Sequence, residues 1–144
     1  MSSPDRATTA WVLIFCAWLI AALSTLGALF MGEVMGLTPC VLCWYQRIAM
    51  FPLVLVLAVG LFPLDARVVR YALPLAVAGL LLAAYHVLLT VGVIPEAMAP
   101  CAQGVPCGKI QVQWFGFVTI PLLSFAAFLA INLLLTFAAL RKTP

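Results

Sequence analysis

Four long apolar stretches, separated by short polar segments, make up most of the chain. Residues 7–32, 48–64 and 110–140 contain no charged side chain, and residues 71–95 contain only His86 as a group that titrates near neutral pH. A transmembrane helix needs about 20 mostly apolar residues. The pattern therefore predicts four transmembrane helices, near residues 10–31, 45–62, 71–92 and 118–139.

The composition indicates a membrane protein with little room for anything else. Of the 144 residues, 67% are hydrophobic and only 8% are charged, which is far from the usual composition of a soluble domain. The polar segments are too short for a second domain. We therefore expect a single integral membrane domain over residues 1–144, an all-α protein built as a four-helix transmembrane bundle. Small residues such as Gly27 and Gly79 would let neighbouring helices approach closely.

The distribution of basic residues predicts which side of the membrane each segment faces. Loops on the cytoplasmic side carry an excess of Lys and Arg. Only Arg47 and Lys109 flank the predicted spans on one side, and five basic residues lie on the other: Arg6, Arg67, Arg70, Arg141 and Lys142. We therefore expect both termini in the cytoplasm. The net charge of +3 follows from this bias and gives no reason to expect nucleic acid as a partner.

A Cys-x-x-Cys pair, Cys40 and Cys43, lies directly before the second apolar stretch, on the expected outer side. Pro39 precedes it and is unfavourable inside a helix, so the helix is expected to begin near these cysteines. The positive end of the helix dipole favours a thiolate at this position. Arg47 lies four residues after Cys43 on the same helical face. It can place a positive charge near the Cys43 sulfur or near an anionic intermediate.

Cys101 and Cys107 form a second pair on the same expected side, between the third and fourth apolar stretches. Gly104 and Pro106 suit a tight loop, so a bond between these two cysteines is sterically feasible. Four cysteines allow three connectivities, and the sequence does not choose between them. The expected resting state has one bond inside each pair, with a bond between the pairs as an intermediate.

Four thiols on one side of an apolar bundle indicate electron transfer through disulfides, which persist in an oxidising outer compartment. A metal site and a purely structural disulfide are the alternatives. Zinc sites usually combine two such motifs with further thiolate or imidazole ligands, and the outer segments contain no His, so no metal is expected. Cys16, inside the first stretch, is expected to be a packing residue. His86 either bonds a neighbouring backbone or hydroxyl group, or serves a quinone as hydrogen-bond donor or proton relay.

The segment 39–48, Pro-Cys-Val-Leu-Cys-Trp-Tyr-Gln-Arg-Ile, resembles the signature of the disulfide bond formation protein B family. Members of that family are membrane thiol:quinone oxidoreductases. Tyr85-His86, the second cysteine pair and residues 114–121 resemble the family at matching places, so the likeness covers all four predicted spans. The spacing of five residues within the second pair is similar to the short-loop, BdbC-like branch.

The resemblance implies a role for each cysteine pair. Cys40 and Cys43 match the pair next to the quinone, and Cys43 would form the adduct or charge-transfer complex with it. Cys101 and Cys107 match the pair that faces the partner, a soluble thioredoxin-like (DsbA-like) thiol oxidase, with Cys101 transiently bonded to the partner. Electrons would pass from the partner through both pairs to the quinone.

The resemblance also implies the acceptor site and the location. Arg47 and His86, together with Cys43, match residues of a site for ubiquinone or menaquinone. The protein would lie in the bacterial inner membrane as a multi-pass protein, with its redox cysteines facing the periplasm. Two alternatives remain at this point: a quinone-linked reductase of the vitamin K epoxide reductase type, and a small multi-span carrier or structural subunit without enzymatic activity.

Overall fold

Four long helices account for most of the chain. The computed structural model describes residues 4–63, 65–101 and 104–142. Its helices are α1 (Pro4–Leu29), α2 (Val41–Leu61), α3 (Val69–Thr90) and α4 (Ile120–Lys142). In this described part of the chain, four helices are long and apolar enough to cross a membrane, which confirms the predicted fold class.

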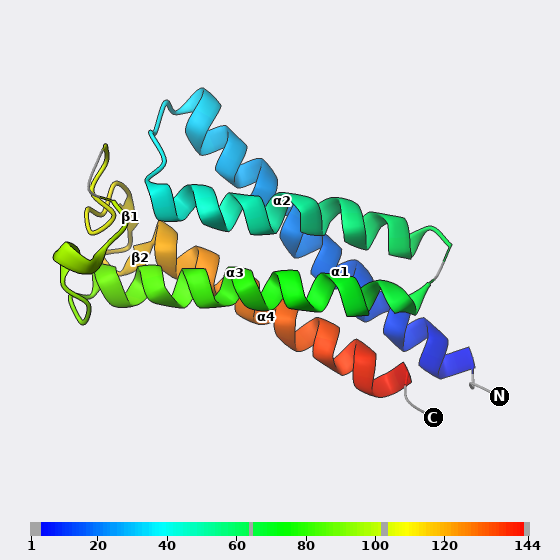
Figure 1. The fold of residues 1–144 in the computed structure, drawn as a ribbon. Coiled ribbons are helices and arrows are strands. Elements are labelled where there is room, and N and C mark those ends of the chain that lie inside the picture. The colour runs from blue at the N-terminus through cyan, green and yellow to red at the C-terminus, as the bar shows by residue number, and fades with distance from the viewer. Residues whose placement is uncertain (1–3, 64, 102–103, 143–144) are drawn as a thin grey trace.

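The helices form a ring in which each packs against two others. α1 contacts α2 and α4, and α3 contacts the same two helices. Figure 1 shows the first turn of α1, the last turn of α4 and the α2–α3 connection at one end of the bundle. The α1–α2 and α3–α4 connections lie at the other end. Both cysteine pairs are therefore brought to a single end, as the predicted topology requires.

The core between the helices consists of closely packed apolar side chains. Leu53, Leu57, Ile131 and Leu135 are fully buried in it together with Phe128. In a membrane, an apolar helix surface is in apolar surroundings both against lipid and against a neighbouring helix. Close van der Waals packing therefore stabilises such a bundle.

The two glycines expected at close helix contacts behave differently. A Cβ added to Gly79 of α3 would overlap the ring of Phe128 on α4, so Gly79 is where these two helices approach closely, as predicted. A Cβ on Gly27 would meet nothing within 4 Å. The expectation was therefore wrong for Gly27, which has open space beside it.

The connections contain short elements that the hydrophobic pattern does not predict. A π-helical turn, Phe30–Val34, continues α1, and 3₁₀ turns cover Ala66–Val68 and Glu96–Met98. Before α4, β1 (Gln113–Trp114) and β2 (Val118–Thr119) form an antiparallel hairpin. Its tip places Phe115 at φ 55° and Gly116 at φ 81°, backbone conformations in which Gly is the favoured residue.

Candidate functional site

Cys40 starts α2 as its N-cap residue. Its backbone is extended, with φ −72° and ψ 169°, and its Sγ accepts a hydrogen bond of 3.3 Å from the backbone N–H of Cys43. A side-chain acceptor at this position satisfies an N–H group that the helix itself leaves unpaired. The helix therefore begins at Val41, next to the cysteines as predicted, and four residues before the predicted edge of the span.

The sulfurs of Cys40 and Cys43 lie 2.9 Å apart and hydrogen bond to each other. Both are free thiols, so the bond expected inside this pair is not formed here. The Cys43 thiol beside the Cys40 sulfur lowers the pKa of Cys40 from 9.0 to about 4, with help from His86 and against the opposing effect of burial. The lowered pKa favours the thiolate form of Cys40 over its thiol.

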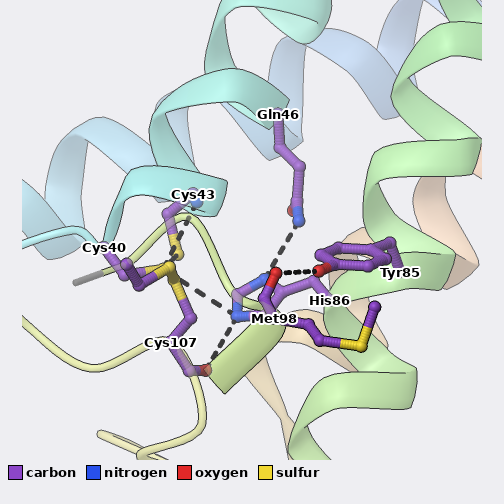
Figure 2. The surroundings of a disulfide bond; sticks show 8 residues. Cys40, Cys43, Gln46, Tyr85, His86, Met98 and Cys107 are labelled. Carbon is purple, nitrogen blue, oxygen red and sulfur yellow. Dashed lines mark hydrogen bonds between the residues drawn. A yellow bond between two sulfur atoms is a disulfide. The ribbon is translucent and has the colours of Figure 1, made fainter. Parts of the chain in front are cut away.

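The second pair forms a disulfide that covers the first pair. Cys101 and Cys107 are bonded, with their Cα atoms 5.9 Å apart, as expected for the resting state. Cys107 is buried and packs with Cys40, Leu42 and Leu89 in one cluster, and Cys101 is half-buried at its edge. Figure 2 shows Cys107 next to Cys40 at the start of α2.

His86 connects the two pairs from α3. Its Nε2 lies 3.8 Å from Cys40 Sγ and 3.2 Å from the Cys107 carbonyl oxygen, so one expectation for it, a bond to a neighbouring backbone group, is confirmed. On the other side of the ring, Nδ1 lies 3.0 Å from Nε2 of Gln46 (Figure 2). The amide oxygen of Gln46 accepts a 2.6 Å hydrogen bond from the Ser124 hydroxyl of α4.

Sequence reasoning missed Gln46 and Ser124. Gln46 is buried and His86 is only 2% exposed, so both are polar groups inside an apolar bundle. Polar residues in a membrane span face the bundle interior, and this was the available signal. The sequence did not show that side chains from three helices form one hydrogen-bonded chain that ends at the imidazole.

Arg47 lies at the contact between α2 and the end of α1. Its Nη2 donates a 2.9 Å hydrogen bond to the Ala28 carbonyl oxygen, and its guanidinium lies 5.4 Å from the ring centre of Trp44. Gly32 leaves room for it, since a Cβ there would be 3.4 Å from Nη2. The guanidinium remains one helical turn from Cys43.

Two hydrogen bonds tie the α3–α4 connection over this end of the bundle. The Tyr85 hydroxyl donates to the Met98 carbonyl oxygen at 3.0 Å (Figure 2). The side-chain amide of Gln111 donates to the Thr38 carbonyl oxygen, in the segment before Cys40, at 2.8 Å. The second cysteine pair is thus held against the first from both sides.

A small pocket opens between the two cysteine pairs. It has a volume of about 30 Å³ and is lined by Cys40, Cys43, His86, Cys107 and Lys109 among others. This is space for about one or two water molecules, whereas pockets for organic ligands measure roughly 300–1,000 Å³. The sulfur and nitrogen atoms of the first three residues lie within 4.8 Å of one another and could hold a soft metal ion. The absence of a metal stays a prediction.

Comparison with known proteins shows the family of the chain. The family model described as "Disulfide bond formation protein DsbB" matches residues 7–138. The chain is 47% identical to a "Probable disulfide formation protein" of Metapseudomonas resinovorans, covering 99% of both chains. It is 42% identical to "Disulfide bond formation protein C" of Bacillus subtilis (strain 168), covering 83% of this chain and 87% of the relative. No solved structure matches. The chain therefore belongs to the DsbB family, and it is a membrane disulfide-generating oxidoreductase.

Proposed function

We propose that this protein reoxidises a soluble thioredoxin-like thiol oxidase and passes the electrons through its two cysteine pairs to quinone. One observation carries the proposal: a disulfide and a dithiol, far apart in sequence, pack in one cluster at one end of the bundle. Family membership favours this oxidase over a reductase of the vitamin K epoxide reductase type. It also argues against a carrier without enzymatic activity, because the family members are oxidoreductases.

The partner exchanges with the second pair in the first step. Cys101 is half-buried and Cys107 is 3% exposed, so Cys101 is the sulfur that a soluble protein can reach. A partner thiolate attacks Cys101, and Cys107 leaves as a thiolate. The second partner thiol then displaces Cys101. The partner ends as a disulfide, and this chain gains two electrons as the Cys101/Cys107 dithiol.

The second step moves the two electrons to the first pair. Cys107 packs in the same buried cluster as Cys40, so its thiolate attacks Cys40 of an oxidised Cys40–Cys43 bond. Cys43 leaves, and Cys101 then displaces Cys40 and restores the Cys101–Cys107 disulfide. The product has a disulfide in the second pair and a dithiol in the first, which are the bonds that the structure contains.

Quinone takes the electrons in the third step. The pocket beside Cys40 is too small for a ring, so we place the quinone at the outward side of α2, where Cys43 is half-exposed and Trp44 is exposed. The Arg47 guanidinium would stabilise negative charge on a quinone oxygen there. Two electrons leave the sulfurs as the Cys40–Cys43 bond forms. The two accompanying protons come from the Cys43 thiol and from water. A quinone-binding role for His86 stays a prediction, because its observed contacts are with Cys40 and Cys107.

The decisive experiment uses purified protein, a reduced thioredoxin-like oxidase and ubiquinone or menaquinone without oxygen. Quinone absorbance should fall as partner disulfide appears, in equal amounts. Cys101→Ser and Cys107→Ser should block exchange with the partner and leave quinone reduction by a chemically reduced first pair intact. Cys43→Ser should abolish quinone reduction. Quinone reduction that survives Cys43→Ser would overturn the proposed path.

We also propose the bacterial inner membrane as the location, with the cysteine end of the bundle in the periplasm and both termini in the cytoplasm. The bias of basic residues supports this orientation. After reduction of intact cells, an impermeant maleimide should label cysteines at this end of the bundle. Labelling that requires a broken inner membrane would reverse the orientation.

A further inference from the structure

A hydrogen-bonded chain of two buried side chains, Gln46 and His86, and the half-buried Ser124 lies next to the cysteine site and has no part in the electron path described above. It passes from Ser124 on α4 through Gln46 on α2 to His86 on α3. We propose that Gln46 and Ser124 are positioning residues that hold the His86 ring as the tautomer protonated on Nε2, so that the ring donates toward Cys40 and Cys107. This inference rests on the proposed function, because it assigns His86 to the first cysteine pair.

The Cys107 carbonyl determines which ring nitrogen carries the proton. Its oxygen lies 3.2 Å from Nε2 of His86 and can only accept a hydrogen bond. An unprotonated Nε2 would place two acceptors against each other in a buried site, which is costly. Nε2 must therefore be the donor. In a neutral ring Nδ1 is then an acceptor that needs a donor of its own.

Gln46 and Ser124 supply that donor and fix its orientation. The Gln46 amide nitrogen lies 3.0 Å from Nδ1, and the Ser124 hydroxyl occupies the amide oxygen at 2.6 Å. With the amide rotated by half a turn, its oxygen would face the unprotonated Nδ1, again acceptor against acceptor. In a neutral ring, the three bonds are consistent only in the order Ser124 to Gln46 to His86 to Cys107. The assignment thus follows from donor and acceptor chemistry at every link.

The fixed tautomer matters for the charge on Cys40. The same Nε2–H points toward the Cys40 sulfur at 3.8 Å, whereas the other tautomer would turn a lone pair toward a thiolate. Other titratable or charged groups near this sulfur are Cys43 on α2 and Lys109 in the α3–α4 connection, which line the same pocket. The apolar stretch of α4, residues 120–140, brings no charge.

The chain contains a single histidine, so the tautomer can be read directly. In protein with ¹⁵N-labelled histidine, NMR should show a protonated Nε2 and an unprotonated, hydrogen-bonded Nδ1. Gln46→Leu should shift the Nδ1 resonance to that of a nitrogen without a donor. Ser124→Ala should mix the two tautomers because the amide is no longer held. Thr136→Val is the matched control: its hydroxyl bonds the Asn132 carbonyl on the same helix, and the His86 signals should not change.

A second measurement separates positioning from simple packing. The thiolate fraction of Cys40 can be followed against pH by its ultraviolet absorbance. At a pH below the Cys40 pKa, this fraction should be about tenfold lower in His86→Ala than in wild type, and about threefold lower in Gln46→Leu. These changes are expected for a weakened hydrogen bond to a charged group. Gln46→Glu is the opposite test: its ionised carboxylate offers Nδ1 only acceptor oxygens, so Nδ1 should become protonated.

Two outcomes would overturn the inference: a wild-type spectrum with the proton on Nδ1, or a Gln46→Leu spectrum identical to wild type. Neither depends on catalysis. The proposed function would fail separately, if wild-type protein did not couple partner oxidation to quinone reduction.

Discussion

Replacing Arg47 by Met tests whether its charge serves the electron acceptor. The substitution keeps most of the side-chain stem and removes the guanidinium, with its 2.9 Å bond to the Ala28 carbonyl and its contact with Trp44. A hydrogen bond to a charged group contributes about 1.5–3 kcal/mol. If a quinone oxygen receives such a bond, its loss should raise the KM for quinone about 10- to 150-fold. The protein should still insert and form its disulfides.

The assay is steady-state quinone reduction over a wide range of quinone concentrations, with an excess of the reduced thioredoxin-like oxidase as electron donor. Arg47→Lys should be intermediate, because it restores the charge without the planar fork of donors. Gly32→Ala is a useful control, since its Cβ would lie in van der Waals contact with the guanidinium, at 3.4 Å from Nη2, and leave the charge in place. It should change KM far less than Arg47→Met does. Wild-type KM values in both the Met and the Lys variant would show that Arg47 only joins α2 to α1, and would refute the reasoning.

Three further predictions concern titration, packing and the fifth cysteine. Because the pKa of Cys40 is lowered to about 4, its thiolate absorbance should persist as the pH falls through neutrality and disappear only near that value; Cys40→Ser should lack this transition. Gly79→Ala should lower the melting temperature, because its Cβ would overlap Phe128, at a cost of about 1–3 kcal/mol; Gly27→Ala, with open space, should not. Cys16→Ala should leave both electron-transfer steps unchanged.

The helices could be predicted from the sequence because uninterrupted apolar length is a strong signal. Their ends were harder. The first span was expected over residues 10–31, and the structure continues the helix in both directions, from Pro4 to a π-helical turn that ends at Val34. Hydropathy indicates which residues can lie in the lipid core. The backbone hydrogen bonds of the helix continue beyond those residues at both ends. α2 begins early for a different reason, the capping sulfur of Cys40.

The cysteines of the site could be predicted, and their surroundings could not. Pair spacing and the expected topology were enough to bring Cys40 and Cys107 to one end. The bond from Gln46 to His86 joins residues 40 positions apart, and the bond from Ser124 to Gln46 joins residues 78 apart. Such contacts depend on how three helices are rotated about their axes, and the weak amphipathicity of nearly uniform apolar helices does not specify that rotation.

The capping role of Cys40 links the stability of the first turn of α2 to the redox state of the first cysteine pair. A thiolate is a strong acceptor for the Cys43 amide, and a disulfide sulfur is a weak one, so oxidation of the first pair should loosen the helix end. A helix cap contributes about 1 kcal/mol. If the cap stabilises the reduced first pair over the oxidised pair by this amount, the reduction potential of the pair rises by about 20 mV. Hydrogen exchange at the Cys43 amide should then be faster in the oxidised protein than in the reduced one. Equal exchange rates in both forms would show that the stability of the first turn of α2 does not depend on the redox state of the first cysteine pair.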